Sequence, residues 1–175
     1  MNPIDALLME LEQEASTTTR VLERIPEDHL NWKPADKSMT LGTLAMHIAG
    51  NPKMLAEMVA NDTHQVDPTF FENMPTASSR AEVMQTLADS VAYAKDYIRG
   101  LTPDQLGATC RMMVGDKELM AYPRGALIRT IMLNHWYHHR GQMSVYLRLL
   151  GVAVPSIYGP SADENPFMKA AGAQA

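Results

Sequence analysis

Apolar residues recur every three or four positions in four long segments of this chain, the spacing that gives a helix one buried face. The first segment runs from about Pro3 to Ile25, with recurring positions at Leu7, Leu8, Leu11, Ala15, Thr18, Val21, Leu22 and Ile25. The others run from Ser38 or Thr40 to about Ala60, from Ser79 to Gly100, and from near Pro123 to Gly151. Alternating β-branched residues are scarce, so strands have little support. We therefore expect an all-α fold, a four-helix bundle.

Start and stop signals flank these segments. Pro3 suits a first helical turn, and Ser79 with Glu82 three residues later forms a capping box. Gly151, followed by Pro155, is a natural stop for the fourth segment. The stretch "TPDQL" predicts one further short helical turn, at residues 102–106.

The connections between the segments are long. They cover residues 26–39, 61–78 and 101–122, whereas antiparallel helices are usually joined by about 2 to 8 residues. Such lengths either shift the helix boundaries or mark functional loops, and they also allow consecutive helices to run parallel. Because 175 residues suffice for one buried core, we expect a single domain over residues 1–175, with a flexible tail from about residue 166.

Composition limits the partners and the compartment. The formal net charge is −5 and no Lys/Arg cluster forms a basic face, which argues against a nucleic-acid partner. No apolar run approaches the roughly 20 residues that span a bilayer, and the acidic N-terminal stretch does not resemble a secretory signal. The single cysteine, Cys110, is consistent with a reducing compartment. We interpret it as a small packing residue rather than as a nucleophile. We therefore expect a cytoplasmic protein with no membrane partner.

Fourteen methionines are many for this length, and they are scattered along the chain. A soft-metal site or an adaptable binding surface would use such residues. Gap filling in a helical core explains scattered methionines better, because a copper site would need them clustered.

The stretch "LNHWYHHRGQ", residues 133–142, holds three of the six histidines. On an α-helix, His135 and His139 lie about 40° apart around the axis, and both fall on the apolar stripe of the fourth segment. His138 lies on the shoulder of that stripe. We therefore expect His135 and His139 to point together into the bundle and His138 to face a helix boundary or water.

Two inward imidazoles one turn apart can converge on a metal ion. A third ligand must come from another helix, and His47 lies at the edge of the apolar stripe of the second segment. His29 and His64 lie in polar connections and are poorer candidates. Three histidines without a fourth protein ligand describe an open site of the kind that binds zinc, nickel, copper or iron(II). The alternative is that they are hydrogen-bonded core residues.

Neighbouring polar residues could orient these histidines. Gln142 and Tyr146 fall on the same side of the helix as the pair, and Asn51 lies one turn after His47. Each could accept or donate a hydrogen bond at the second nitrogen of a histidine, as metal-bound imidazoles require. Arg140 points away from the stripe, so we expect it in a surface or interface ion pair.

Two stretches carry a family resemblance: "LNWKPADKSMTLGTLAMHIAGN" (30–51) and "IRTIMLNHWYHHRGQMSVYLRLLGVAVPSIYGPSADE" (128–164). The chain resembles the DinB-like family of bacterial four-helix-bundle metalloproteins, whose last helix commonly carries H-x-x-x-H-R-G-Q. The resemblance implies metal ligation by His47, His135 and His139, with water completing the coordination of zinc, nickel or a similar divalent ion; iron and manganese are further options. It also implies an up-down-down-up topology with long crossover loops, and homodimerisation.

The resemblance implies thiol-dependent transferase chemistry with bacillithiol or mycothiol, or related isomerase chemistry. Our leading hypothesis is therefore a metal-dependent enzyme that activates a low-molecular-weight thiol, or water, to attack a small electrophilic substrate. Metal-assisted hydrolysis is the second hypothesis. A non-catalytic, stress-associated dimer in which the ion joins two helices is the third, because no acidic residue near the histidines in sequence supplies a general base.

Overall fold

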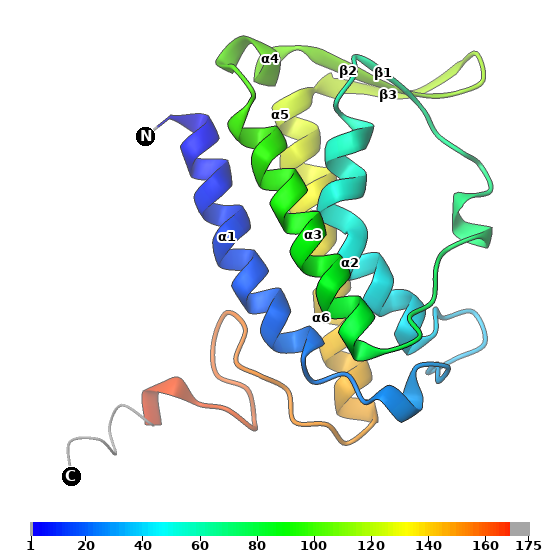
Figure 1. The fold of residues 1–175 in the computed structure, drawn as a ribbon, viewed down its shortest axis with the longest axis vertical. Helices are drawn as coiled ribbons and strands as arrows, with labels where there is room; N and C mark the ends of the chain where they lie inside the picture. The colour runs from blue at the N-terminus through cyan, green and yellow to red at the C-terminus, as the bar shows by residue number, and fades with distance from the viewer. Residues whose placement is uncertain (1, 169–175) are drawn as a thin grey trace.

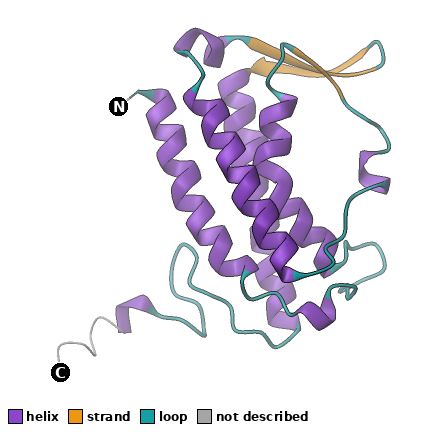
Figure 2. Cartoon of the chain, viewed as in Figure 1, coloured by secondary structure: helices purple, strands orange, loops and turns teal. Residues whose placement is uncertain are grey.

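The computed structural model describes residues 2–168, which form a bundle of long helices with a small sheet at one end (Figures 1 and 2). Three long helices are α1 (Pro3–Leu22), α2 (Leu41–Met58) and α3 (Arg80–Arg99). The fourth helical segment is continuous but not uniform: α5 (Arg124–Leu127), a π-helix η3 (Ile128–Asn134) and α6 (His135–Leu149). The shorter elements are η1 (Glu27–His29), β1 (Thr63–Gln65), η2 (Phe70–Glu72), α4 (Pro103–Gly107), β2 (Thr109–Val114) and β3 (Lys117–Pro123).

The predicted helix ends agree with the structure to within a few residues. The side-chain oxygens of Thr40 and Ser79 accept hydrogen bonds from backbone amides at the starts of α2 and α3. Glu82 caps differently from the prediction, because its carboxylate accepts from the backbone and hydroxyl of Ser78 rather than from Ser79. At Gly151, φ is +71°, and the hydrogen bond from the next amide to the Leu147 carbonyl completes a Schellman stop.

The core fills the space between the four long helical segments. α2 packs against α3, η3 and α6, and α3 also packs against α1. The largest core side chains are at most 1% exposed, among them Leu11, Leu22, Leu44, Ile48, Ile98 and Trp136. No helix in the described part of the chain is both long enough and apolar enough to cross a membrane. The predicted tail lies mostly outside the described residues, at 169–175.

The all-α prediction is wrong at one end of the bundle, where three strands form a sheet in the order β1-β2-β3. β1 pairs with β2 in parallel, and β2 pairs with β3 antiparallel. The β2–β3 loop has two residues, Gly115 and Asp116, and φ of +56° at Gly115 suits the first position of such a loop. The strands are short and rich in methionine, so they lack the β-branched alternation on which the prediction relied.

The connection from α2 to α3, residues 59–79, runs along the length of the bundle and includes β1 and η2 (Figure 1). α2 and α3 therefore begin at the same end and are parallel neighbours. Arg124, only 4% exposed, fixes the first part of this crossover. Its guanidinium donates to the carbonyl oxygens of Val59 and Gln105 and to the carboxylate of Asp62, at 2.6–2.8 Å.

Candidate metal centre

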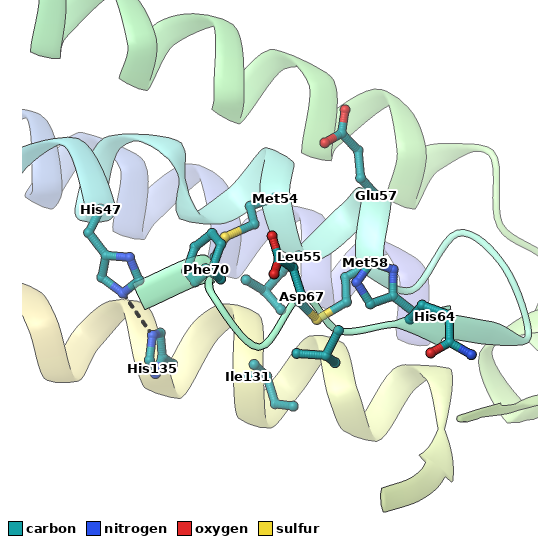
Figure 3. Close-up of a pocket in the computed structure, with 12 residues that line it drawn as sticks. His47, Met54, Leu55, Glu57, Met58, His64, Asp67, Phe70, Ile131 and His135 are labelled. Carbon is teal, nitrogen blue, oxygen red and sulfur yellow. Dashed lines mark hydrogen bonds between the residues drawn. The ribbon is translucent and has the colours of Figure 1, made fainter. Parts of the chain in front are cut away.

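Three histidines from two helices meet inside the bundle. His47 comes from α2, and His135 and His139 come from the first and second turns of α6. One ring nitrogen from each lies within 4.8 Å of the others, and the Nε2 atoms of His47 and His135 are 3.0 Å apart (Figure 3). His47 and His139 are each only 7% exposed. The structure thus brings together the three residues that the sequence singled out, while His138 is exposed.

Two hydrogen bonds hold α2 against the segment that carries His135. Pro52 has no N–H, so the carbonyl of Ile48 lacks its usual helical donor. The indole nitrogen of buried Trp136 donates to that carbonyl at 2.8 Å. One turn away, the amide nitrogen of Asn51 donates to the carbonyl of Met132 in the π-helix at 2.9 Å. These two bonds flank His135 along its helical segment and follow His47 on α2, so they hold the two histidine-bearing helices together next to the pair.

The three residues predicted to orient the histidines differ in what they contact. Gln142 Oε1 lies 2.7 Å from His139 Nδ1, and a carboxamide oxygen only accepts, so Nδ1 carries the proton and Nε2 keeps its lone pair. Asn51 reaches the π-helix instead of a histidine, and its buried Oδ1 has no hydrogen-bond partner among the described residues. Tyr146 packs edge-on against Trp32 and donates to the Met39 carbonyl.

The buried histidines are neutral at pH 7. Burial, together with the nearby His139 and His135, lowers the pKa of His47 to about 4. Burial also lowers the pKa of His139 to about 4, against an opposing effect of the hydrogen bond to Gln142. For His135, burial and then the nearby His138 lower the pKa. Neutral imidazoles each keep a lone pair, which is the form that binds metal ions.

The donor set fits a divalent metal ion. Two imidazole nitrogens that each lie about 2.05 Å from one tetrahedral ion would be about 3.3 Å apart. The observed 3.0 Å between the Nε2 atoms of His47 and His135 is close to that value. Three neutral nitrogen donors without a carboxylate are typical of a site that leaves coordination positions open. These residues could therefore hold such an ion.

A cavity of about 410 Å³ opens beside the histidines, with His47 and His135 at one end (Figure 3). Its walls come from α2, from Ile131 in the π-helix and from the crossover segment that carries Val66, Asp67 and Phe70. Met54 and Met58 line it, so these two methionines form part of a ligand-sized surface rather than only filling the core.

Comparisons with known proteins agree with this architecture. The DinB family profile matches residues 1–168. The chain belongs to the DinB family. It is 29% identical over 165 residues to the uncharacterized protein YrdA of Bacillus subtilis (strain 168), covering 92% of this chain and 91% of that protein.

Two solved structures share the fold of this DinB-family chain. One is a DinB-like protein from Bacillus cereus ATCC 10987, with a TM-score of 0.69, 21% identity, and coverage of 88% of this chain and 97% of that one. The other is YfiT from Bacillus subtilis, described as a probable metal-dependent hydrolase with an unusual four-helix bundle topology. Its TM-score is 0.63 at 14% identity, with coverage of 86% of this chain and 89% of YfiT.

Sequence reasoning missed two parts of the site and misplaced one residue. The π-helix just before His135 has no recognisable signal in "IRTIMLN", although such turns are frequent near functional sites. The crossover wall of the cavity could not be placed without the tertiary fold. Arg140, expected in a surface or interface ion pair, is 1% exposed, because its side of α6 faces α1. Its ion pair is internal, with Glu14 at 2.6 Å.

Proposed function

We propose that this DinB-family protein is a divalent-metal-dependent enzyme that activates a small nucleophile, a thiol or water, at His47, His135 and His139. The observation that carries the proposal is the convergence of three imidazoles, two buried and that of His135 half-buried, beside a ligand-sized cavity. We include in it the up-down-down-up order of the long helices, which the parallel run of α2 and α3 supports.

The residues of this chain have distinct roles in the proposal. His47, His135 and His139 would hold the ion, and Gln142 fixes the ring orientation of His139 through Nδ1. The ion supplies Lewis acidity, which lowers the pKa of a thiol or of water enough to provide a nucleophile at neutral pH. Apolar residues near the histidines, including Met54, Phe70 and Ile131, exclude bulk water from the reacting groups.

Thiol transfer is the reaction to test first. Met54 and Phe70 lie nearest to His47 along the cavity, and no hydrogen bond joins the lining residues Glu57, His64 or Asp67 to a histidine of the triad among the described residues. Attack by a thiol needs less help from a base than attack by water, because a thiol ionises more readily. Hydrolysis is the second candidate, and the description of YfiT as a probable metal-dependent hydrolase favours it.

Several finer features belong to the same proposal. Zinc or nickel is the ion that we favour, because imidazole nitrogens suit both, with iron or manganese as further options. A cytoplasmic homodimer that acts on a small molecule is the expected form. In the rival proposal, the ion joins α2 to α6 in a stress-associated dimer without catalysis.

Metal content decides whether the site exists. Protein purified without an affinity tag should contain about one divalent ion per chain by elemental mass spectrometry. His47→Ala, His135→Ala and His139→Ala should each lose it, whereas the control His138→Ala should keep it, because His138 is exposed beside the site. Circular dichroism checks that each variant is folded. Full metal retention by all three variants would rule out the triad.

Turnover separates the enzyme from the scaffold. Low-molecular-weight thiols with an aryl chloride test S-transfer, in which a C–S bond forms and chloride and a proton leave. Aryl esters test hydrolysis. We expect metal-dependent turnover in one assay, abolished by His135→Ala and retained by His138→Ala. No turnover in either assay, together with unfolding on chelation, would favour the structural dimer.

A further inference from the structure

The cavity beside the histidines is elongated along α2. His47 and His135 lie at one end of it in Figure 3 and His64 at the other, with Phe70, Met54 and Met58 between them. Eleven helical steps lead from His47 to Met58, which corresponds to about 16 Å along the axis of α2. An elongated space of about 410 Å³ suits an extended chain or an aryl-alkyl group.

The walls of the cavity are mainly aliphatic. Met54, Leu55 and Met58 from α2 face Ile131 from the π-helix, and Val66 comes from the crossover. The thioether side chains of methionine adapt to ligands of varied shape. Each methylene group that leaves water for such a surface contributes about 0.8 kcal/mol, which corresponds to about fourfold in affinity. Apolar length should therefore govern how tightly a ligand binds.

The charge around the cavity disfavours anions. Glu57 and Asp67 line it, and no lysine or arginine is among the described residues that do. Lys53 ion-pairs weakly with Glu57 at 3.8 Å, but its ammonium lies over the ring of Tyr93, away from the cavity. A ligand carboxylate in the cavity would meet two like charges, whereas an amine or an uncharged group would not.

Resting on the proposed function, we propose that the substrates of this enzyme are extended aliphatic or aryl-alkyl compounds, uncharged or cationic, of about a dozen non-hydrogen atoms. The electrophilic group lies beside His47 and His135. The apolar chain of the ligand runs along α2 past Asp67 toward Met58, and its far end approaches Glu57 and His64.

Binding to metal-free protein tests this assignment independently of catalysis. Isothermal titration with the straight-chain alcohols from butanol to octanol should show affinity rising about fourfold per methylene. Octylamine should bind at least as tightly as octanol, and octanoate at least tenfold more weakly than octylamine. Affinity independent of chain length, or octanoate as the tightest ligand, would overturn the proposal.

A variant that fills part of the cavity tests where the apolar chain of the ligand binds. Met58→Trp should weaken octanol binding more than tenfold and leave butanol binding unchanged. The matched control Met9→Trp, on the exposed surface of α1, should leave both unchanged. Metal content should stay at the wild-type level in both variants. If Met58→Trp bound octanol as tightly as the wild type, the alkyl chain of octanol would lie elsewhere, and the proposal would be refuted.

The failure of this proposal can be told from that of the proposed function. His139 does not line the cavity, so His139→Ala should lose the metal and still bind octanol. If wild-type protein bound octanol but contained no metal as purified, the substrate class would stand and the metal-dependent enzyme would be refuted. If the protein contained metal but bound alcohols with an affinity independent of chain length, the substrate class would be refuted and the metal-dependent enzyme would stand.

Discussion

His139 and Arg140 are neighbours in sequence and both are buried, but they lie about 100° apart around α6 and face different neighbours. Arg140 meets its counter-charge: Glu14 at 2.6 Å, with Thr18 and the hydroxyl of Tyr158 completing its hydrogen bonds. His139 meets the imidazoles of His47 and His135, and no carboxylate of the described residues belongs to this cluster. Buried polar groups in proteins are normally paired. The Arg140 cluster is complete within the chain, whereas the histidine cluster has donors enough for a cation from outside.

Breaking the Arg140 cluster should give the largest effect on stability. Arg140→Met leaves the Glu14 carboxylate buried without a counter-charge, which should lower the free energy of unfolding by about 3–5 kcal/mol. Urea unfolding followed by circular dichroism measures it. Arg24→Met is the control; it removes an ion pair between two partly exposed side chains, Arg24 and Glu164, and should cost about 0–1 kcal/mol. Equal losses in the two variants would contradict the contrast between the clusters.

Acid should weaken the histidine cluster. In the folded, metal-free protein the pKa of His47 and of His139 is about 4, below the value of 6.5 for an exposed histidine. The unfolded chain therefore binds more protons between these values, so stability is present above about pH 6.5 and is lost as the pH falls toward 4. Each of the two histidines should contribute a loss on the order of 3 kcal/mol.

Urea unfolding of metal-free protein from pH 7 to pH 4 checks this loss. His29→Asn, which removes an exposed histidine paired with Asp28, should leave the pH profile unchanged. His47→Gln should flatten it. A profile that is the same in His47→Gln as in the wild type would assign the acid sensitivity to other groups.

A divalent ion should stabilise the histidine cluster and leave the Arg140 cluster unaffected. At a free zinc concentration of 100 times Kd, the free energy of unfolding should rise by about 2.7 kcal/mol. Thermal or urea unfolding with and without zinc measures the gain. The gain should vanish in His135→Ala and persist in His138→Ala. An equal gain in His135→Ala would mean that zinc binds elsewhere.

The smallest expected effect is at Gln142. Gln142→Ala removes the acceptor for His139 Nδ1, and loss of such a partner typically lowers metal affinity by about 10- to 100-fold. Competition with a chromophoric chelator measures it. Tyr146→Phe, which removes a hydroxyl bonded to the Met39 carbonyl, should leave metal affinity unchanged. If Tyr146→Phe weakened binding as much, the role assigned to Gln142 would be wrong.

The sequence predicts the helices well because their signals are local. The caps at Thr40 and Ser79 and the stop at Gly151 depend on residues within one turn. The pairing of His135 with His139 was predictable for the same reason, since both lie within one uniform α-helix. Predicting His47 as the third member required only the apolar stripe of a second helix.

The remaining features depend on tertiary neighbours. The burial of Arg140 follows from α1 packing on the second side of α6, which the apolar stripe of α6 alone does not indicate. The strands at 63–65 and 109–123 are stabilised by pairing with each other and by the bonds of Arg124. The hairpin did have one local signal, the pair Gly115–Asp116 between two strand-length runs.

The separation of the histidines along the chain also bears on how the protein folds. His47 and His135 are 88 residues apart, and the crossover between α2 and α3 adds further non-local contacts. Non-local contacts slow folding because chain entropy is lost before they form. The three ring nitrogens come together only after the fourth helical segment has docked, so a nascent chain that ends before residue 135 lacks the site altogether. Metal capture would therefore mark the last stage of folding.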